Sequence, residues 1–164
     1  MKTHWKKLRD SSEYFGAHDL YDSEGNKFDM NVTIRRVSKK NVKNTDGTDE
    51  PCMIAEMVNS KPIIINATNS KTIASLSKSA FVEDWAGLTI TVYPERIRAF
   101  GEFVDAIRIR KVLPPQLPIL NPESPKWAEA VKYCKDATDK AKAIQTTRKS
   151  YILSDEDAKK LMNL

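Results

Sequence analysis

Residues 88–112 read LTITVYPERIRAFGEFVDAIRIRKV, and this stretch indicates the type of fold. Leu88, Ile90 and Val92 alternate with more polar residues, which is the period of a half-buried β-strand. Residues 103–112 predict a second strand, with Ile107 and Ile109 on one face and arginines on the other. Ala99-Phe100-Gly101 lies between the two and predicts a turn, so this part of the chain is expected to form a β-hairpin.

Three further strands and one helix are expected before this hairpin. Residues 28–34 alternate apolar and polar side chains, and Phe28 is expected in the core. Residues 52–58 and 62–65 predict the second and third strands, and a helix is expected from Thr68 or Asn69 to Lys78. The order β-β-β-α-β-β, over about ninety residues, predicts a mainly β protein built on a five-stranded OB-fold barrel. Another small barrel or an α+β sheet fits the same order.

The prolines divide the chain. Five of the eight fall between Pro114 and Pro125, where they exclude a helix or a central strand and predict a semi-rigid linker. We therefore expect an N-terminal arm over residues 1–20, the OB-fold domain over 21–112, a linker over 113–125 and a small helical tail over 126–164. In the tail, Trp127, Val131 and Cys134 form one helical stripe, and Ser154 with the acids after it predicts another helix start.

Composition and charge narrow the class of protein. The 164 residues carry 27 Lys+Arg and 22 Asp+Glu, a net charge of +5. The longest apolar run covers only residues 52–55, far short of a membrane span, and no apolar segment follows the basic N-terminus to form a secretory signal. We therefore expect an intracellular protein with no membrane partner. The two cysteines, Cys52 and Cys134, form no CxxC pair and are expected to be free thiols.

Motifs of catalysis and cofactor binding are absent from the sequence. There is no GxGxxG or GxxxxGKS/T phosphate-binding loop and no GxSxG nucleophile motif. The two histidines, His4 and His18, lie in the N-terminal arm without metal-ligand spacing. We therefore predict a protein without catalytic activity, cofactor or metal.

Clustered cations are the strongest functional signal. One cluster spans nine residues without an acid, at the end of the first strand and in the loop after it; a second flanks the loop between the fourth and fifth strands; a third lies on the last strand. Neutralisation of nucleic-acid phosphates requires cations grouped in this way, and these two loops border the ligand groove of OB-folds. A single cluster of this kind is more often an ordinary solvated surface than a binding site, and the case for binding depends on two clusters falling at corresponding loops. The three clusters comprise Arg35, Arg36, Lys39, Lys40 and Lys43; Arg96 and Arg98; and Arg108, Arg110 and Lys111.

Single-strand binding also needs aromatic side chains on which bases stack. Phe100 at the hairpin turn and Tyr93 on the outward side of its strand are the candidates. Trp85 is expected in the core beside the helix. Only 8% of the residues are aromatic, so a stacking surface would be small.

Three blocks of sequence carry a resemblance. They are KPIIINATNSKTI at 61–73, DWAGLTITVY at 84–93 and AFGEFVDAIRIR at 99–110, with FGAHDL at 15–20 as a further match. Together they resemble a family of small proteins encoded by bacteriophages and integrated elements, whose members are similar in element order to OB-fold single-stranded-DNA-binding proteins. The resemblance implies a role in phage-type DNA replication or recombination in the cytoplasm of a bacterial host. It assigns no ligand residues. The C-terminus, KKLMNL, lacks the acidic recruiting peptide of bacterial single-stranded-DNA-binding proteins.

Two hypotheses follow. In the first, the protein binds single-stranded DNA with little base specificity through the basic loops and one or two aromatic residues, with RNA left open as a ligand. In the second, the barrel is a scaffold, and the helical tail docks a phage or host replication or recombination protein through Trp127, Val131, Leu161 and Met162. The positions of the basic residues in the folded chain distinguish them, because only the first hypothesis needs these residues to line one groove.

Overall fold

A computed structural model describes residues 13–44 and 46–164. The chain divides into two compact units between Pro114 and Pro115, within the stretch predicted as a linker. Residues 1–12, which hold His4 and most of the predicted N-terminal arm, lie outside the described residues.

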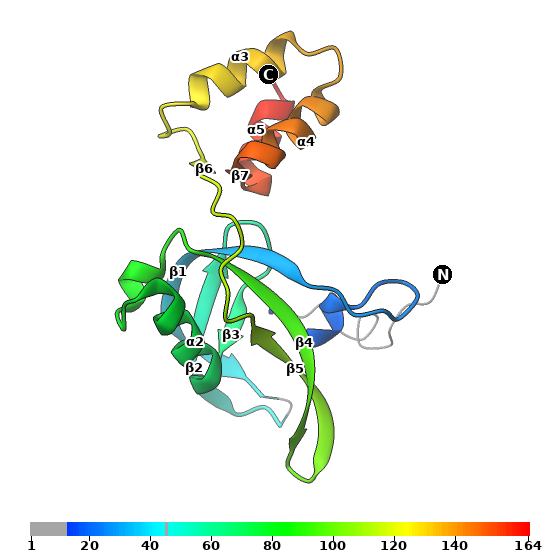
Figure 1. Cartoon of the computed structure of the whole chain (residues 1–164), viewed down its shortest axis with the longest axis vertical. Coiled ribbons are helices and arrows are strands. Elements are labelled where there is room, and N and C mark those ends of the chain that lie inside the picture. The colour runs from blue at the N-terminus through cyan, green and yellow to red at the C-terminus, as the bar shows by residue number, and fades with distance from the viewer. Residues whose placement is uncertain (1–12, 45) are drawn as a thin grey trace. The chain divides into compact units, whose positions relative to one another are not determined.

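Unit 1 contains an antiparallel sheet of five strands in the order β3-β2-β1-β4-β5 (Figure 1). Within the described residues, no pairing joins the end strands β3 and β5, so the five strands predicted as an OB-fold barrel form an open sheet that does not close. The fold is therefore a mixed one, a five-stranded sheet accompanied by helices. The strands are β1 (Met30–Lys43), β2 (Asp49–Met57), β3 (Ile63–Ile65), β4 (Thr89–Ala99) and β5 (Glu102–Ile109).

The helix between β3 and β4 begins one or two residues before the predicted cap. Helix α2 spans Ala67–Ser77, and its N-cap is Asn66, whose side chain accepts a hydrogen bond from the backbone N–H of Asn69. The short 3-10 helix η2 (Val82–Trp85) follows. Trp85 is buried, as predicted, and its indole N–H donates to the carbonyl oxygen of Ser79 at 3.0 Å.

The core of unit 1 includes residues from the predicted arm. Leu20, at the end of the 3-10 helix η1 (Ala17–Leu20), is fully buried, and Phe15 packs against the core. Phe28 is 40% exposed, so its predicted core position is wrong. The alternation does not reach Phe28 because β1 begins two residues later, at Met30. The buried cluster is formed chiefly by Val32, Ile34, Ala55, Ile63, Ile73, Trp85, Ile90 and Val92.

A β-bulge changes which side chains of β1 face the core. The pairing of β1 with β2 shifts register between Ile34 and Arg36, so Arg35 is an extra residue. Before the bulge, Ile34 faces the core; after it, Val37 packs against the core and Arg36 points to solvent. Because side chains alternate along a strand, one extra residue exchanges the two faces for the rest of the strand.

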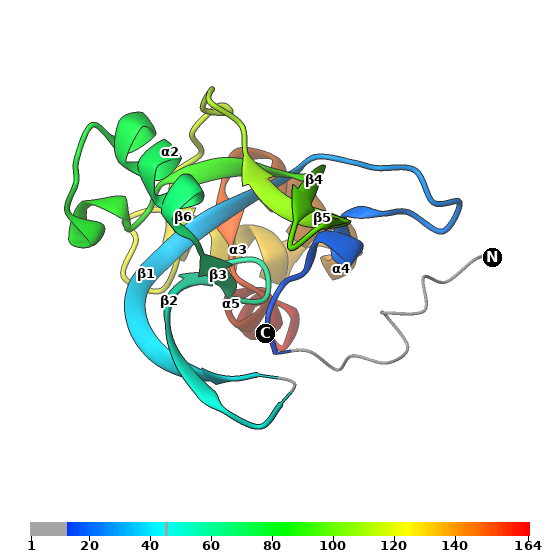
Figure 2. The same ribbon diagram turned by 90° about the horizontal axis from the view of Figure 1, so that it is seen from below.

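Two strands are longer than predicted and extend past the core. β1 continues to Lys43, so its later lysines lie on the strand and not in a loop. β4 continues to Ala99 through Pro94. Proline has no backbone N–H, but pairing with β1 ends at Val92, so no hydrogen bond from residue 94 to β1 is needed. The β1–β2 and β4–β5 hairpins extend from the same end of unit 1, the lower end in Figure 1, and Figure 2 views both from that end.

Unit 2 is a small helical cluster with its own core. Its two-residue strands β6 (Ile119–Leu120) and β7 (Ile152–Leu153) pair in parallel, so β6 forms regular structure inside the stretch predicted as a linker. Ser154 caps α5 through a hydrogen bond from the backbone N–H of Asp157, as the sequence predicted. No helix in the described part of the chain has the length and apolar character needed to cross a membrane. The helices are α3 (Trp127–Asp136), α4 (Lys140–Ser150) and α5 (Asp155–Met162).

Candidate nucleic-acid interface

Strand register sorts the basic residues of the two hairpins onto two surfaces. After the bulge, Lys39 and Lys43 share the core-facing side of β1 with Val37. On β4, Arg96 and Arg98 continue the side of buried Val92 beyond the end of the core. Phe103 lies directly opposite Arg98 and is 66% exposed. We define the inner surface as Lys39, Lys43, Arg96, Arg98 and Phe103.

The opposite side of the β1–β2 hairpin carries two of the predicted site residues in an ion-pair cluster. Arg36 donates two hydrogen bonds to the Glu56 carboxylate, at 2.7 and 2.9 Å, and Lys40 donates a third at 2.8 Å. The bonds from Arg36, and then that from Lys40, hold the pKa of Glu56 at about 2. One carboxylate therefore partly neutralises both cations.

The outer side of β4 and β5 is neutralised in the same way. Arg108 pairs with Glu95 at 3.2 Å, and Arg110 makes two hydrogen bonds to Asp29, at 2.8 and 3.0 Å, that lower the pKa of this carboxyl. The Arg110 guanidinium also lies 3.7 Å from the centroid of the Tyr93 ring. One face of Tyr93, a predicted stacking residue, is therefore already covered by a cation.

The cations of the inner surface are less neutralised. Among the residues that the structure describes, Lys39, Lys43 and Arg98 have no acidic partner within 4.0 Å. Arg96 lies over the ring of Phe103, 5.5 Å from its centroid. Asp105, opposite Arg96, is hydrogen-bonded to Tyr21, whose pKa is raised by burial and by this carboxylate.

The two surfaces differ in their balance of charge. On the strands of the two hairpins, the inner side carries four cations and two carboxylates, Asp49 and Asp105. The outer side carries four cations, among them Arg36 and Arg110, and five carboxylates when Asp29 is included. The sequence clusters are thus divided between an electropositive inner surface and a neutralised outer one, and on β1 this division depends on the bulge.

Phe100 occupies a backbone conformation that bulky residues rarely adopt. It has a φ of 52° and Gly101 a φ of 82°, as the two central residues of a type I′ hairpin turn require. Asparagine or glycine normally takes the first of these positions, because an L side chain crowds the backbone there. Phe100 is fully exposed, so no packing of its side chain compensates for this cost. An exposed aromatic in a strained turn is typical of a functional position.

Besides the four cations of the outer surface and Phe100 at the hairpin turn, three more predicted site residues lie outside the inner surface, and one residue of that surface was missed. Arg35 is the extra residue of the bulge, and Lys111 lies beyond β5, at its end far from the hairpin turn. Tyr93 is stacked by Arg110. Phe103 was not singled out, although its place directly across from Arg98 could be read from a two-residue turn at Phe100-Gly101.

The tail residues proposed to dock a partner are mostly used inside unit 2. Leu161 is fully buried, and Trp127 and Val131 pack against the same small core. Of the four, only Met162 is substantially exposed. An apolar side chain already packed in its own core contributes little to a docking surface.

Comparison of the chain with protein-family models, with curated proteins and with solved structures finds no match. Within the described residues, no group of three or more His, Cys, Asp or Glu side chains is placed to hold a metal ion.

Proposed function

We propose that unit 1 is an OB-fold module, without catalytic activity, that binds single-stranded DNA between its two hairpins. The strand order, the long bent β1 that pairs with both β2 and β4, and the helix between β3 and β4 support this assignment. OB-folds are partly open five-stranded barrels, and they bind oligonucleotides beside the loops that join their first two and last two strands. The β1–β2 and β4–β5 hairpins end in these loops.

The inner surface supplies what single-strand binding requires. Lysine and arginine side chains without acidic partners neutralise phosphates with little competition, and the release of counterions favours binding. Phe103 and the exposed Phe100 offer rings on which bases stack, irrespective of the base. The observation that carries the proposal is that cations without acidic partners lie on the core-facing side of both hairpins, with the exposed Phe103 on the same side of β5 and the exposed Phe100 at the turn of that hairpin.

Fluorescence anisotropy of a labelled oligo-dT, titrated with the full chain at several salt concentrations, tests this function. We expect saturable binding that weakens steeply with salt and exceeds binding to a duplex of equal length. An RNA of the same length addresses the preference between DNA and RNA. Absence of binding at low salt would refute the proposal and direct attention to unit 2, where Tyr133 and Met162 are exposed apolar side chains.

A matched pair of variants locates the ligand. Lys39→Gln/Lys43→Gln removes two charges from the inner surface, and Arg36→Gln/Lys40→Gln removes two from the outer surface of the same hairpin. Each lysine that no longer pairs with a phosphate lowers the slope of log K against log salt by about 0.7 for single strands. With two lysines replaced, we expect the inner variant to lose about 1.4 in slope and the outer variant much less. Equal effects would show that binding follows net charge and not the inner surface.

The resemblance to phage-encoded proteins suggests that the bound strand is an intermediate of phage-type replication or recombination. In that setting the protein would protect or present DNA to other enzymes.

A further inference from the structure

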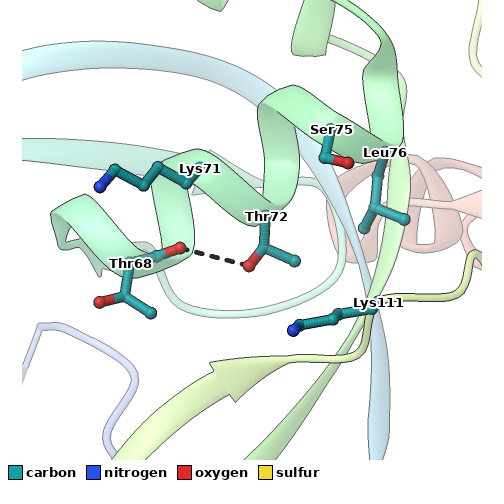
Figure 3. A pocket seen from close by; sticks show the side chains of 6 residues that line it. All are labelled: Thr68, Lys71, Thr72, Ser75, Leu76 and Lys111. Carbon is teal, nitrogen blue, oxygen red and sulfur yellow. Dashed lines mark hydrogen bonds between the residues drawn. The ribbon is translucent and has the colours of Figure 1, made fainter.

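A pocket of about 490 Å³ lies between helix α2 and the chain that follows β5 (Figure 3). Five of its lining residues come from α2, and one, Lys111, faces them from the other side. The volume lies in the range of small-molecule sites. Its lining residues are Thr68, Lys71, Thr72, Ser75, Leu76 and Lys111.

The polar groups of this pocket suit an anion. Two ammonium groups, Lys71 and Lys111, line it together with three hydroxyls, and none of the described residues that line it carries a carboxylate. Within the described part of the chain, neither lysine has an acidic partner within 4.0 Å. Both charges are therefore free to pair with a ligand.

The hydroxyls differ in what they can donate. Thr72 donates its proton to the backbone carbonyl oxygen of Thr68 at 3.2 Å, the dashed line in Figure 3. No hydrogen bond to another described residue uses the hydroxyls of Thr68 and Ser75. These two side chains remain available as donors to an anion between the lysines, and Leu76 adds an apolar contact at one end.

The pocket is separate from the inner surface. β5 runs from Glu102 at the hairpin turn to Ile109, seven steps of about 3.3 Å, so its two ends lie about 23 Å apart. Lys111 follows the far end. A ligand in this pocket is therefore not held by the hairpin residues Arg98 and Phe100.

We propose that the α2 pocket binds a nucleotide phosphate, with Lys71 and Lys111 pairing with its oxygens and either Thr68 or Ser75 donating a hydrogen bond. The phosphate can be that of a free nucleotide or of a nucleic-acid strand, because both present the same oxygens. Leu76 contacts the uncharged part of the ligand. This site is additional to the hairpin interface and does not depend on it.

Isothermal titration of the full chain with inorganic phosphate, with dTMP and with a short oligo-dT distinguishes these sources, and amide NMR shifts of α2 locate the binding. A hydrogen bond to a charged group contributes about 1.5–3 kcal/mol, so Lys71→Gln and Lys111→Gln should each weaken binding at least tenfold. Lys71→Arg should retain most of it. Lys135→Gln, an exposed lysine of α3 in unit 2, is the matched control and should change nothing.

The three probes and the two lysine variants separate the possible results. Binding of dTMP that requires Lys71 and Lys111 supports a free-nucleotide site, and an effect of these variants on oligo-dT alone supports a contact to a strand. No binding of any probe, or binding that neither lysine affects, overturns the inference. The experiments also distinguish failure of the hairpin proposal from failure of this one. If only the hairpin proposal fails, Lys39→Gln/Lys43→Gln leaves oligo-dT binding unchanged, while dTMP still shifts the α2 amide signals.

Discussion

Replacing Phe100 should change stability and binding in opposite directions. Phe100 holds a φ of 52° and is fully exposed. The left-handed conformation costs an L residue about 1–2 kcal/mol, and asparagine tolerates it better than other side chains. Since no packing is removed, Phe100→Asn should stabilise unit 1 by about 1 kcal/mol. With an m value of about 1.5 kcal/mol/M, the urea midpoint should rise by about 0.7 M.

The same substitution should weaken single-strand binding. Stacking contributes about 1–3 kcal/mol per base, which corresponds to a loss of about 5- to 150-fold in affinity. Phe100→Ala separates the two effects, because alanine removes the ring but keeps a Cβ in the strained conformation. We expect Phe100→Ala to lose affinity as Phe100→Asn does, without the rise in stability.

Urea unfolding followed through the amide NMR signals of Ile90 and Val92 reports unit 1 alone, since both residues lie in its core. Anisotropy of labelled oligo-dT gives the affinity. A midpoint that stays constant or falls in Phe100→Asn would refute the argument from backbone strain. Unchanged affinity in Phe100→Ala would refute the stacking role, whatever happens to stability.

Three further variants test the fold and its electrostatics. Arg36 and Lys40 lower the pKa of Glu56 from 4.5 to about 2. The Glu56 carboxylate therefore stabilises the fold above pH 4.5, and this contribution is lost as the pH falls toward 2. In Glu56→Gln, the free energy of unfolding should fall less steeply with pH between 4.5 and 2 than in the unchanged protein. Leu161→Ala removes a fully buried side chain and should destabilise unit 2 by about 2–5 kcal/mol, leaving the oligo-dT affinity of unit 1 intact; a parallel loss of affinity would contradict the division into units. Asn66→Ala removes the cap of α2 and should lower the free energy of unfolding of unit 1 by about 1 kcal/mol in a urea titration, and a change below about 0.3 kcal/mol would show that the cap is dispensable.

The sequence predicted the order of elements well because each is marked by a local signal. Alternation indicated the strands, Ser154 indicated the start of α5, and the Ala99-Phe100-Gly101 segment indicated the hairpin turn, which the structure narrows to Phe100-Gly101. The ends of the strands and helices were predicted less well. β1 continues to Lys43 because cross-strand pairing with β2 holds a polar segment that has no apolar alternation of its own.

The candidate site was predicted as a set of residues but not as a surface. Charge spacing identified Arg36 and Arg110 alongside Lys39, yet the first two are neutralised by Glu56 and Asp29, acids distant in the sequence. The pairing of Arg36 with Glu56 depends on the register of β1 against β2, which shifts at the bulge at Arg35, whereas the pairing of Arg110 with Asp29 depends on β1 and β5 lying on either side of β4. A one-residue irregularity leaves almost no trace in composition or periodicity, so the inner and outer sides of β1 beyond Ile34 could not be told apart beforehand.

The bulge also determines what kind of genetic change β1 can absorb. Point substitutions at Lys39 or Lys43 alter one side chain and leave the rest of the strand in place. Deletion of Arg35 would leave Ile34 and Arg36 opposite the consecutive residues Met57 and Glu56, so the bulge would disappear while Val37 stays toward the core. Deletion of Ser38 would instead exchange every later side chain of β1 with its neighbour. Among descendants of this chain, length changes should therefore be confined to the bulge at Arg35 and to the loop between β1 and β2, while exposed positions such as Lys39 vary in residue type.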